Sequence, residues 1–320
     1  MDRLLQSLLF LVSGISLFAL GACSNRLGPY QDLLVGEPSE LVSSPRGREV
    51  QVTYLGTNGF LVRSHQVTIA IDPYFSRLDT RRILLNAPVA PDQTSISTAI
   101  RQARFPKSVD AWLVTHAHFD HLFDIPVLAG IHGGRIVTSR TGAYLSEASG
   151  ISPGRISATK PGKVHHFGDA RVTVLSARHD KALGVTPYPG VIEAPLAAPP
   201  SRPRDWRMGE PLAFLIELEG KRIYIESGGL PGSPPEVSDV DLAIVGVATP
   251  SSQARYAEAV SALNPRFVLP SHQDNFFIPV DRGFHFSTLA DFPRILATHQ
   301  VERLPGEVIL MDYFQTWSLP

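Results

Sequence analysis

Four side chains that can bind a metal ion lie within six consecutive residues of this chain. They are His116, His118, Asp120 and His121. An apolar run at 111–114 precedes them and predicts a short buried strand that ends where the motif begins. Zinc and related ions accept imidazole nitrogens and carboxylate oxygens, and alternate side chains of such a turn can converge on one point. The pattern favours a metal site over a solvated histidine-rich loop.

Three more candidates follow predicted strands later in the chain. His179 lies just after the strand predicted over 171–176, and His272 lies just after the one predicted over 266–269. Between them, a strand over 222–226 ends in Glu226, which Ser227 and Gly228 follow. Because these groups are again imidazoles or a carboxylate, they extend the set of potential metal ligands.

The spacing His-x-His-x-Asp-His resembles the signature of the metallo-β-lactamase superfamily. That family also uses two later histidines and an intervening aspartate, each at the end of a strand. Here the order and spacing match from about 49 to 314, with one departure: Glu226 stands where the family usually has aspartate. The resemblance implies an α/β fold, the four-layer αββα sandwich, with the hydrolase domain at 49–320.

The resemblance also implies two metal ions, each held by three side chains. The first set is His116, His118 and His179, and the second is Asp120, His121 and His272. Zinc is expected for both, although other divalent metals would suit such ligands. The ions would activate a hydroxide, which Asp120 would orient, so no serine or cysteine nucleophile is required. Glu226 would reach both ions, but its extra methylene leaves two other outcomes open: binding of one ion only, or selection of a different ion.

The expected substrate class comes from three further segments, at 55–60, 72–73 and 271–276. They are most similar to the branch that contains N-acylphosphatidylethanolamine-hydrolysing phospholipase D, which implies a phosphodiester or phospholipid-like substrate. The alternatives are hydrolysis of a lactone, thioester or β-lactam, and a catalytically idle metal-containing envelope protein that binds a ligand.

The pattern of apolar residues predicts two sheet-rich halves flanked by helices. Strands are expected over 50–55, 60–62, 67–72, 111–114, 135–137, 171–176, 212–218, 222–226, 240–247, 266–269 and 307–311. Helices are expected over 123–130, 140–149, 253–263 and 288–299. Segments 76–108 and 184–210 are expected to be irregular, and the second is either a passive loop or a wall of the pocket that affects substrate choice.

The N-terminal segment predicts export. Arg3 precedes an apolar run over 4–20, and the run ends in Leu20-Gly21-Ala22-Cys23, which resembles a bacterial lipobox. We expect a signal peptide at 1–22, a lipidated Cys23 and a flexible tether over 23–48. Ser24 favours the periplasmic face of the outer membrane in this resemblance. An uncleaved membrane anchor is the alternative.

Composition limits the remaining possibilities. With a formal net charge of −1 over 320 residues, the chain offers no electrostatic basis for binding nucleic acid. Cys23 is the only cysteine, so the domain can have neither an internal disulfide nor a thiolate metal ligand.

Several other polar residues are expected to lie outside the metal site. Asp72 is expected to organise a turn before proline. Three arginines near 80 are expected either to face solvent or to bind an anionic headgroup; they are Arg77, Arg81 and Arg82. Six further histidines are expected to be structural or exposed, with only His285 within reach of the pocket rim; the six are His65, His132, His165, His166, His285 and His299.

Overall fold

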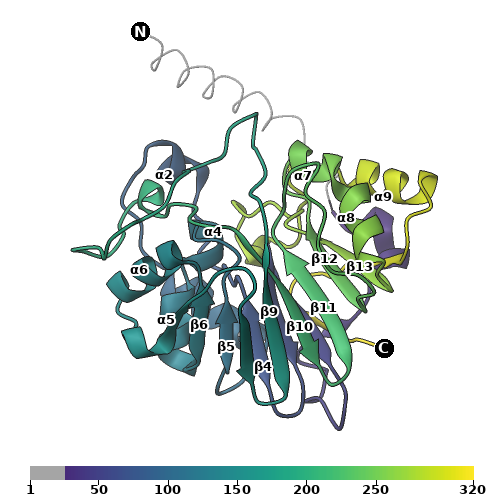
Figure 1. The fold of residues 1–320 in the computed structure, drawn as a ribbon, viewed down its shortest axis with the longest axis horizontal. Helices are drawn as coiled ribbons and strands as arrows, with labels where there is room; N and C mark the ends of the chain where they lie inside the picture. The colour runs from purple at the N-terminus through teal and green to yellow at the C-terminus, as the bar shows by residue number, and fades with distance from the viewer. Residues whose placement is uncertain (1–25) are drawn as a thin grey trace.

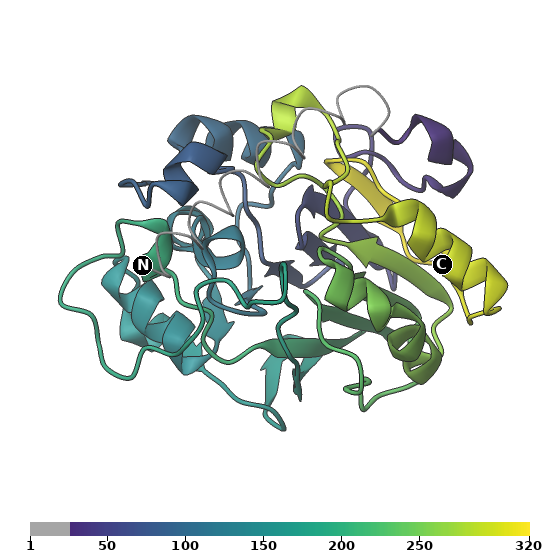
Figure 2. The same cartoon turned by 90° about the horizontal axis from the view of Figure 1, so that it is seen from above.

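The computed structural model describes residues 26–320 and shows two β-sheets packed face to face between two groups of helices (Figure 1, Figure 2). This four-layer α/β arrangement is the expected αββα sandwich. The predicted signal peptide and Cys23 lie outside the described residues.

The first sheet has eight strands in the order β1-β15-β2-β3-β4-β5-β6-β7. It is antiparallel as far as β4 and parallel from β4 to β7. The strands are β1 (Glu37–Pro38), β2 (Gln51–Gly56), β3 (Gly59–Arg63), β4 (Thr68–Ile71), β5 (Ala111–Leu113), β6 (Arg135–Thr138), β7 (Ile156–Ala158) and β15 (Gln315–Ser318).

The second sheet has seven strands in the order β14-β13-β12-β11-β10-β9-β8. Its strands are antiparallel from β8 to β11 and parallel from β11 to β14. The strands are β8 (Val164–Phe167), β9 (Ala170–Ser176), β10 (Leu212–Leu218), β11 (Lys221–Glu226), β12 (Leu242–Gly246), β13 (Phe267–Ser271) and β14 (Glu307–Val308).

Both faces of the central strands of each sheet are buried. The inner faces pack on each other through alternate apolar residues such as Val62 and Phe214. The outer face of the first sheet packs against α3 (Gln93–Gln102), α5 (Ile125–His132) and α6 (Arg140–Ala148). The outer face of the second packs against α8 (Tyr256–Leu263) and α9 (Phe292–Val301). The short helices are α2 (Thr80–Leu84), α4 (Phe119–Leu122) and α7 (Pro250–Ala254), with 3-10 turns at Gly28–Leu33, Pro153–Arg155, Pro203–Asp205 and Val280–Arg282.

Most expected elements are present, and the differences have physical reasons. Segment 76–108 is not wholly irregular, because Asp92 caps the amides of Thr94 and Ser95 and begins α3. The helix expected over 253–263 is two helices that meet at Arg255. His165 and His166 lie in strand β8, not in a loop.

The segment expected to be a tether is packed against the sandwich from Leu27 onward. Leu27 belongs to the core, the Val35 amide donates to the Leu310 carbonyl, and β1 pairs with β15. A flexible tether over all of 23–48 is therefore wrong. Among the described residues, no helix has the length and apolar character needed to cross a membrane.

Candidate metal centre

Three histidine rings converge at the ends of β5 and β9. Nε2 of His116 lies 2.9 Å from Nδ1 of His118 and 3.1 Å from Nε2 of His179. Three nitrogens at zinc–nitrogen distances of about 2.0–2.1 Å in a tetrahedral site would lie roughly 3.3 Å apart. The three rings are therefore already spaced as the ligands of one ion.

A second set of three lies beside the first. Asp120 Oδ2 is 3.6 Å from Nε2 of His121 and 3.3 Å from Nε2 of His272. The rings of His116 and His121 have centroids 4.0 Å apart, so the two sets are neighbours. All three side chains are buried, and the donor set of one carboxylate and two imidazoles suits a divalent ion.

Burial and neighbouring charges keep two imidazoles of the first set and the carboxylate of the second in forms that can bind a metal ion. Burial and the neighbouring imidazoles hold the pKa of His116 well below its usual value and lower the pKa of His118 to about 3. Both rings are therefore neutral and offer a lone pair. Burial alone would raise the pKa of Asp120, but His121 and His272 outweigh it and lower that pKa, so the carboxylate is ionised.

His121 is oriented by a buried carboxylate. Its Nδ1 lies 2.8 Å from Asp72 Oδ2, which leaves Nε2 directed to Asp120. The Asp72 carboxylate also accepts hydrogen bonds from the Thr115 backbone amide at 2.9 Å and from the Asn58 side-chain amide at 3.0 Å. Its backbone adopts φ +41° directly after β4. As expected, Asp72 is structural, and the structure adds that it holds a candidate ligand in place.

His179 has its own acidic neighbour. Its Nδ1 lies 2.7 Å from the Asp180 carbonyl oxygen and 3.1 Å from Asp180 Oδ1. The hydroxyl of Thr249 donates to Asp180 Oδ2 at 2.8 Å and so connects His179 to the start of α7. These contacts leave Nε2 of His179 free to face His116.

A cavity of about 220 Å³ opens onto both sets. Its walls are mainly apolar and come from segments far apart in the sequence; they include Ile83, Phe119, Pro187, Tyr188, Phe276, Phe277 and Leu289. Pro187 and Tyr188 belong to segment 184–210, which therefore forms part of the pocket wall and is not a passive loop. No lysine or arginine of the described chain lines this cavity.

Comparison with known proteins identifies the family. The model of the beta-lactamase superfamily domain matches residues 51–272. The chain belongs to this family.

Several proteins that are similar to this chain in sequence are metal-dependent hydrolases. A "UPF0173 metal-dependent hydrolase" of Desulforamulus reducens is 27% identical over 236 residues, which cover 71% of this chain and 86% of that protein. Another, from Polynucleobacter asymbioticus, is 25% identical over 289 residues, or 86% and 90% of the two chains. This chain is accordingly a metal-dependent hydrolase of the superfamily.

Solved structures show the same fold at low identity. Igni18, a metallo hydrolase from Ignicoccus hospitalis, gives a TM-score of 0.55 at 17% identity over 85% of this chain and 99% of that one. An isothiocyanate hydrolase from Delia radicum gut bacteria gives 0.53 at 12% identity over 84% and 99%.

The structure brings six of the seven predicted ligands of this superfamily member together. They are His116, His118, Asp120, His121, His179 and His272. That these six residues bind metal ions is a prediction, and their arrangement is consistent with it. The histidines expected to lie elsewhere do so: His132 and His299, for example, contact the carbonyl oxygens of Pro106 and Gly306.

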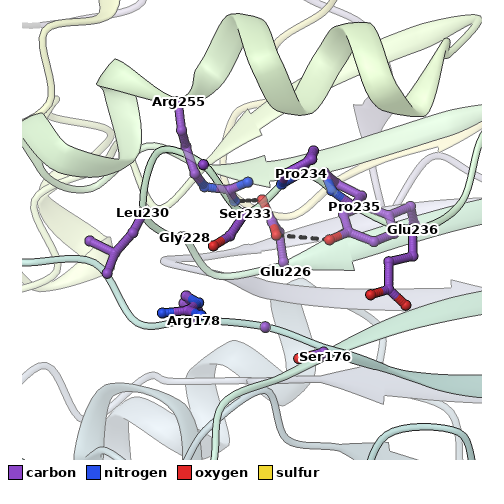
Figure 3. A pocket seen from close by; sticks show the side chains of 14 residues that line it. Ser176, Arg178, Glu226, Gly228, Leu230, Ser233, Pro234, Pro235, Glu236 and Arg255 are labelled. Carbon is purple, nitrogen blue, oxygen red and sulfur yellow. Dashed lines mark hydrogen bonds and ion pairs between the residues drawn. The ribbon is translucent and has the colours of Figure 1, made fainter.

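Glu226 is the exception. It accepts the Tyr224 hydroxyl at 2.8 Å and forms an ion pair with Arg255, and it lines a different cavity of about 360 Å³ (Figure 3). Successive side chains at the end of β11 point to opposite faces, so Ser227 turns toward His116 while Glu226 faces α8. The expectation that Glu226 reaches both metal ions is therefore wrong.

Arg77 also differs from expectation. It is buried and pairs with Asp274 at 2.9 Å, so it neither faces solvent nor is available to a lipid headgroup. Arg81 and Arg82 are exposed.

Sequence reasoning missed the supporting residues Asp180 and Thr249. The pair His179-Asp180 directly after a strand was a usable local signal. The contact with Thr249 was not, because 69 positions separate it from Asp180.

Proposed function

We propose that this metal-dependent hydrolase cleaves a phosphodiester in a phospholipid-like substrate. The observation that carries the proposal is the apolar cavity that opens onto both ligand sets. A cavity with such walls suits a hydrocarbon chain next to the bond that is cleaved. The similarity of segments 55–60, 72–73 and 271–276 to the phospholipase D-like branch supports the phosphodiester.

The donor atoms suit two zinc ions. Five imidazoles and one carboxylate are available, and zinc accepts both kinds of ligand. We propose His116, His118 and His179 for the first ion and Asp120, His121 and His272 for the second. Bound ions of this class lower the pKa of water toward neutrality and polarise the scissile bond.

The chain's own residues would supply orientation and exclude bulk water. Asp120 is ionised and lines the cavity, so its carboxylate can accept a proton from an attacking water molecule. Tyr188, Phe276 and Phe277 surround the same space with apolar surface. Water is thereby restricted near the reacting bond, and electrostatic interactions there are strengthened.

One observation favours a second candidate. Because no lysine or arginine of the described residues lines the cavity, a phosphate would have only the metal ions to balance its charge. An uncharged acyl substrate, such as a lactone, thioester or β-lactam, avoids that requirement. The alternative of a catalytically idle binding protein is set aside, because the similar proteins are metal-dependent hydrolases and Glu226, whose misplaced bridge suggested that alternative, pairs with Arg255 instead.

The test is turnover by the zinc-loaded protein of bis-p-nitrophenyl phosphate, a lactone and a thioester. Faster turnover of the phosphodiester supports the first proposal, and faster turnover of the lactone or thioester replaces it with the second. Activity on none of them would contradict both proposed substrate classes. His118→Ala should abolish any turnover, and retained activity would show that the proposed centre is not the site of reaction.

We further propose that the protein is exported and anchored by lipid on Cys23. The support is the apolar run and Leu20-Gly21-Ala22-Cys23. Since Leu27 is already part of the core, only four positions separate it from Cys23, and the domain would lie close to the membrane surface. Cys23→Ser should release the protein from membranes with metal binding intact; native protein that carries no lipid would contradict the proposal.

A further inference from the structure

Ser227 and Gly228, the first two residues after β11, lie behind the three-histidine set. Ser227 Oγ lies 3.1 Å from Nδ1 of His116. A Cβ on Gly228 would lie 3.1 Å from Asp180 Oδ2, so this glycine, at φ +143°, packs against the carboxylate beside His179. The segment 226–229 therefore borders His116 directly and His179 through Asp180.

The same segment is anchored on its other face. Glu226 pairs with Arg255 and accepts the Tyr224 hydroxyl, and a Cβ on Gly229 would lie 2.4 Å from Arg255 Nε (Figure 3). Arg255 and Glu226 are only 2% and 3% exposed. Side chains held in this way lose little further freedom when a metal ion binds, which favours a precise position for Ser227.

The contact to His116 has a direct chemical consequence. A neutral imidazole carries one proton, so a ring that gives its Nε2 lone pair to an ion must carry that proton on Nδ1. Nε2 of His116 is the atom that faces His118 and His179. Nδ1 then needs an acceptor, and Ser227 Oγ is nearer than the other candidate, Thr115 Oγ1 at 3.4 Å, which itself donates to Asp72.

We infer that Ser227 is a positioning residue for the first metal ion. Its hydroxyl accepts the Nδ1–H of His116 and fixes the tautomer and orientation in which Nε2 is free for the ion. This inference rests on the ligand roles proposed above. It assigns Ser227 neither a nucleophilic role nor a direct bond to metal.

The inference predicts an effect on one ion only. The second set is oriented by different groups, since His121 is held by Asp72. Loss of a partner that orients a ligating histidine typically weakens metal affinity by about 10- to 100-fold. Ser227→Ala should therefore weaken binding of one zinc ion by about 10-fold or more and leave the other unchanged.

The experiment measures zinc affinity and stoichiometry by competition with a chromophoric chelator. Ser227→Thr keeps the hydroxyl and should bind both ions almost as native protein does. Ser233→Ala is the matched control, because Ser233 lines the cavity behind the segment and no histidine lines that cavity. His118→Ala, measured in parallel, tests the metal centre itself, and circular dichroism confirms that each variant is folded.

Each outcome decides a different point. Selective weakening of one ion in Ser227→Ala, restored in Ser227→Thr, supports the inference. Native affinity for both ions, or equal weakening of both, overturns it, because the hydroxyl would then have no specific role at His116. If His118→Ala also keeps both ions at native affinity, the proposed metal centre fails, which is a separate result.

Discussion

Replacing Glu226 by glutamine should destabilise the fold and leave both metal ions bound. The side chains of Arg255 and Glu226 are 2% and 4% exposed and form a buried ion pair. Glutamine has nearly the same volume and can still accept the Tyr224 hydroxyl, but it carries no charge to balance the guanidinium. Removal of one partner of a buried pair typically costs about 3–5 kcal/mol, because the remaining charge is buried without compensation.

The assay is thermal unfolding together with metal analysis. A loss of about 3–5 kcal/mol corresponds to a Tm decrease on the order of 10 °C for a chain of this size. Glu236→Gln is the matched control, since Glu236 lines the same cavity but is exposed, and its free energy of unfolding should change by no more than about 0.5 kcal/mol. At saturating zinc, Glu226→Gln should hold as many ions as native protein.

A different combination of Tm and metal content in Glu226→Gln would refute this prediction. A native Tm combined with the loss of one ion would mean that Glu226 is a metal ligand and that its pairing with Arg255 contributes little to stability.

Three further predictions concern the surroundings of the site. Asp72→Asn should weaken zinc binding at the second set by about 10- to 100-fold in the same chelator competition, because His121 loses its carboxylate partner; unchanged affinity would contradict this role. Burial raises the pKa of the Asp124 carboxyl to about 6, above its value of about 3.9 in the unfolded chain. The protonated carboxyl therefore contributes fully to the free energy of unfolding below about pH 4, and this contribution is lost as the pH rises through 6. Asp124→Asn should therefore remove about 3 kcal/mol of pH dependence from the free energy of unfolding between pH 4 and 7, and an unchanged profile in denaturant titrations would show that the shift is absent. Tyr188→Ala should raise KM by roughly 5-fold for substrates with an apolar chain, through about 1 kcal/mol of lost contact, with little change for a short-chain analogue; equal changes for both would mean that Tyr188 does not contact the chain.

The ligand sets could be predicted from sequence because the information is local. His116, His118, Asp120 and His121 share one turn, and His179 and His272 each follow a recognisable apolar strand. Strand ends are therefore sufficient to place these groups. The αββα architecture followed from the resemblance and from the two sheet-rich halves.

The direction of Glu226 could not be read in the same way. When only one face of a strand is buried, alternation of apolar and polar residues shows which side chains point inward. In β11 both faces are buried: Ile223 and Ile225 pack between the sheets, and Tyr224 packs under the helices. The apolar run therefore does not show which face of the sheet each side chain points to, and the sequence predicts the wrong face for Glu226.

The packed segment from Leu27 escaped prediction for a different reason. Its strand β1 has only two residues, and its partner β15 lies at the other end of the chain. Nothing within 26–48 indicates that pairing, and the turn-rich composition favoured a loop.

Anomalous diffraction at the zinc absorption edge, from crystals of the zinc-loaded protein, tests the central claim most directly. We predict two peaks, one among His116 Nε2, His118 Nδ1 and His179 Nε2, and one among Asp120 Oδ2, His121 Nε2 and His272 Nε2. Glu226 should remain paired with Arg255 in the same map. A peak coordinated by Glu226, or the absence of zinc from both sets, would contradict this account of the site.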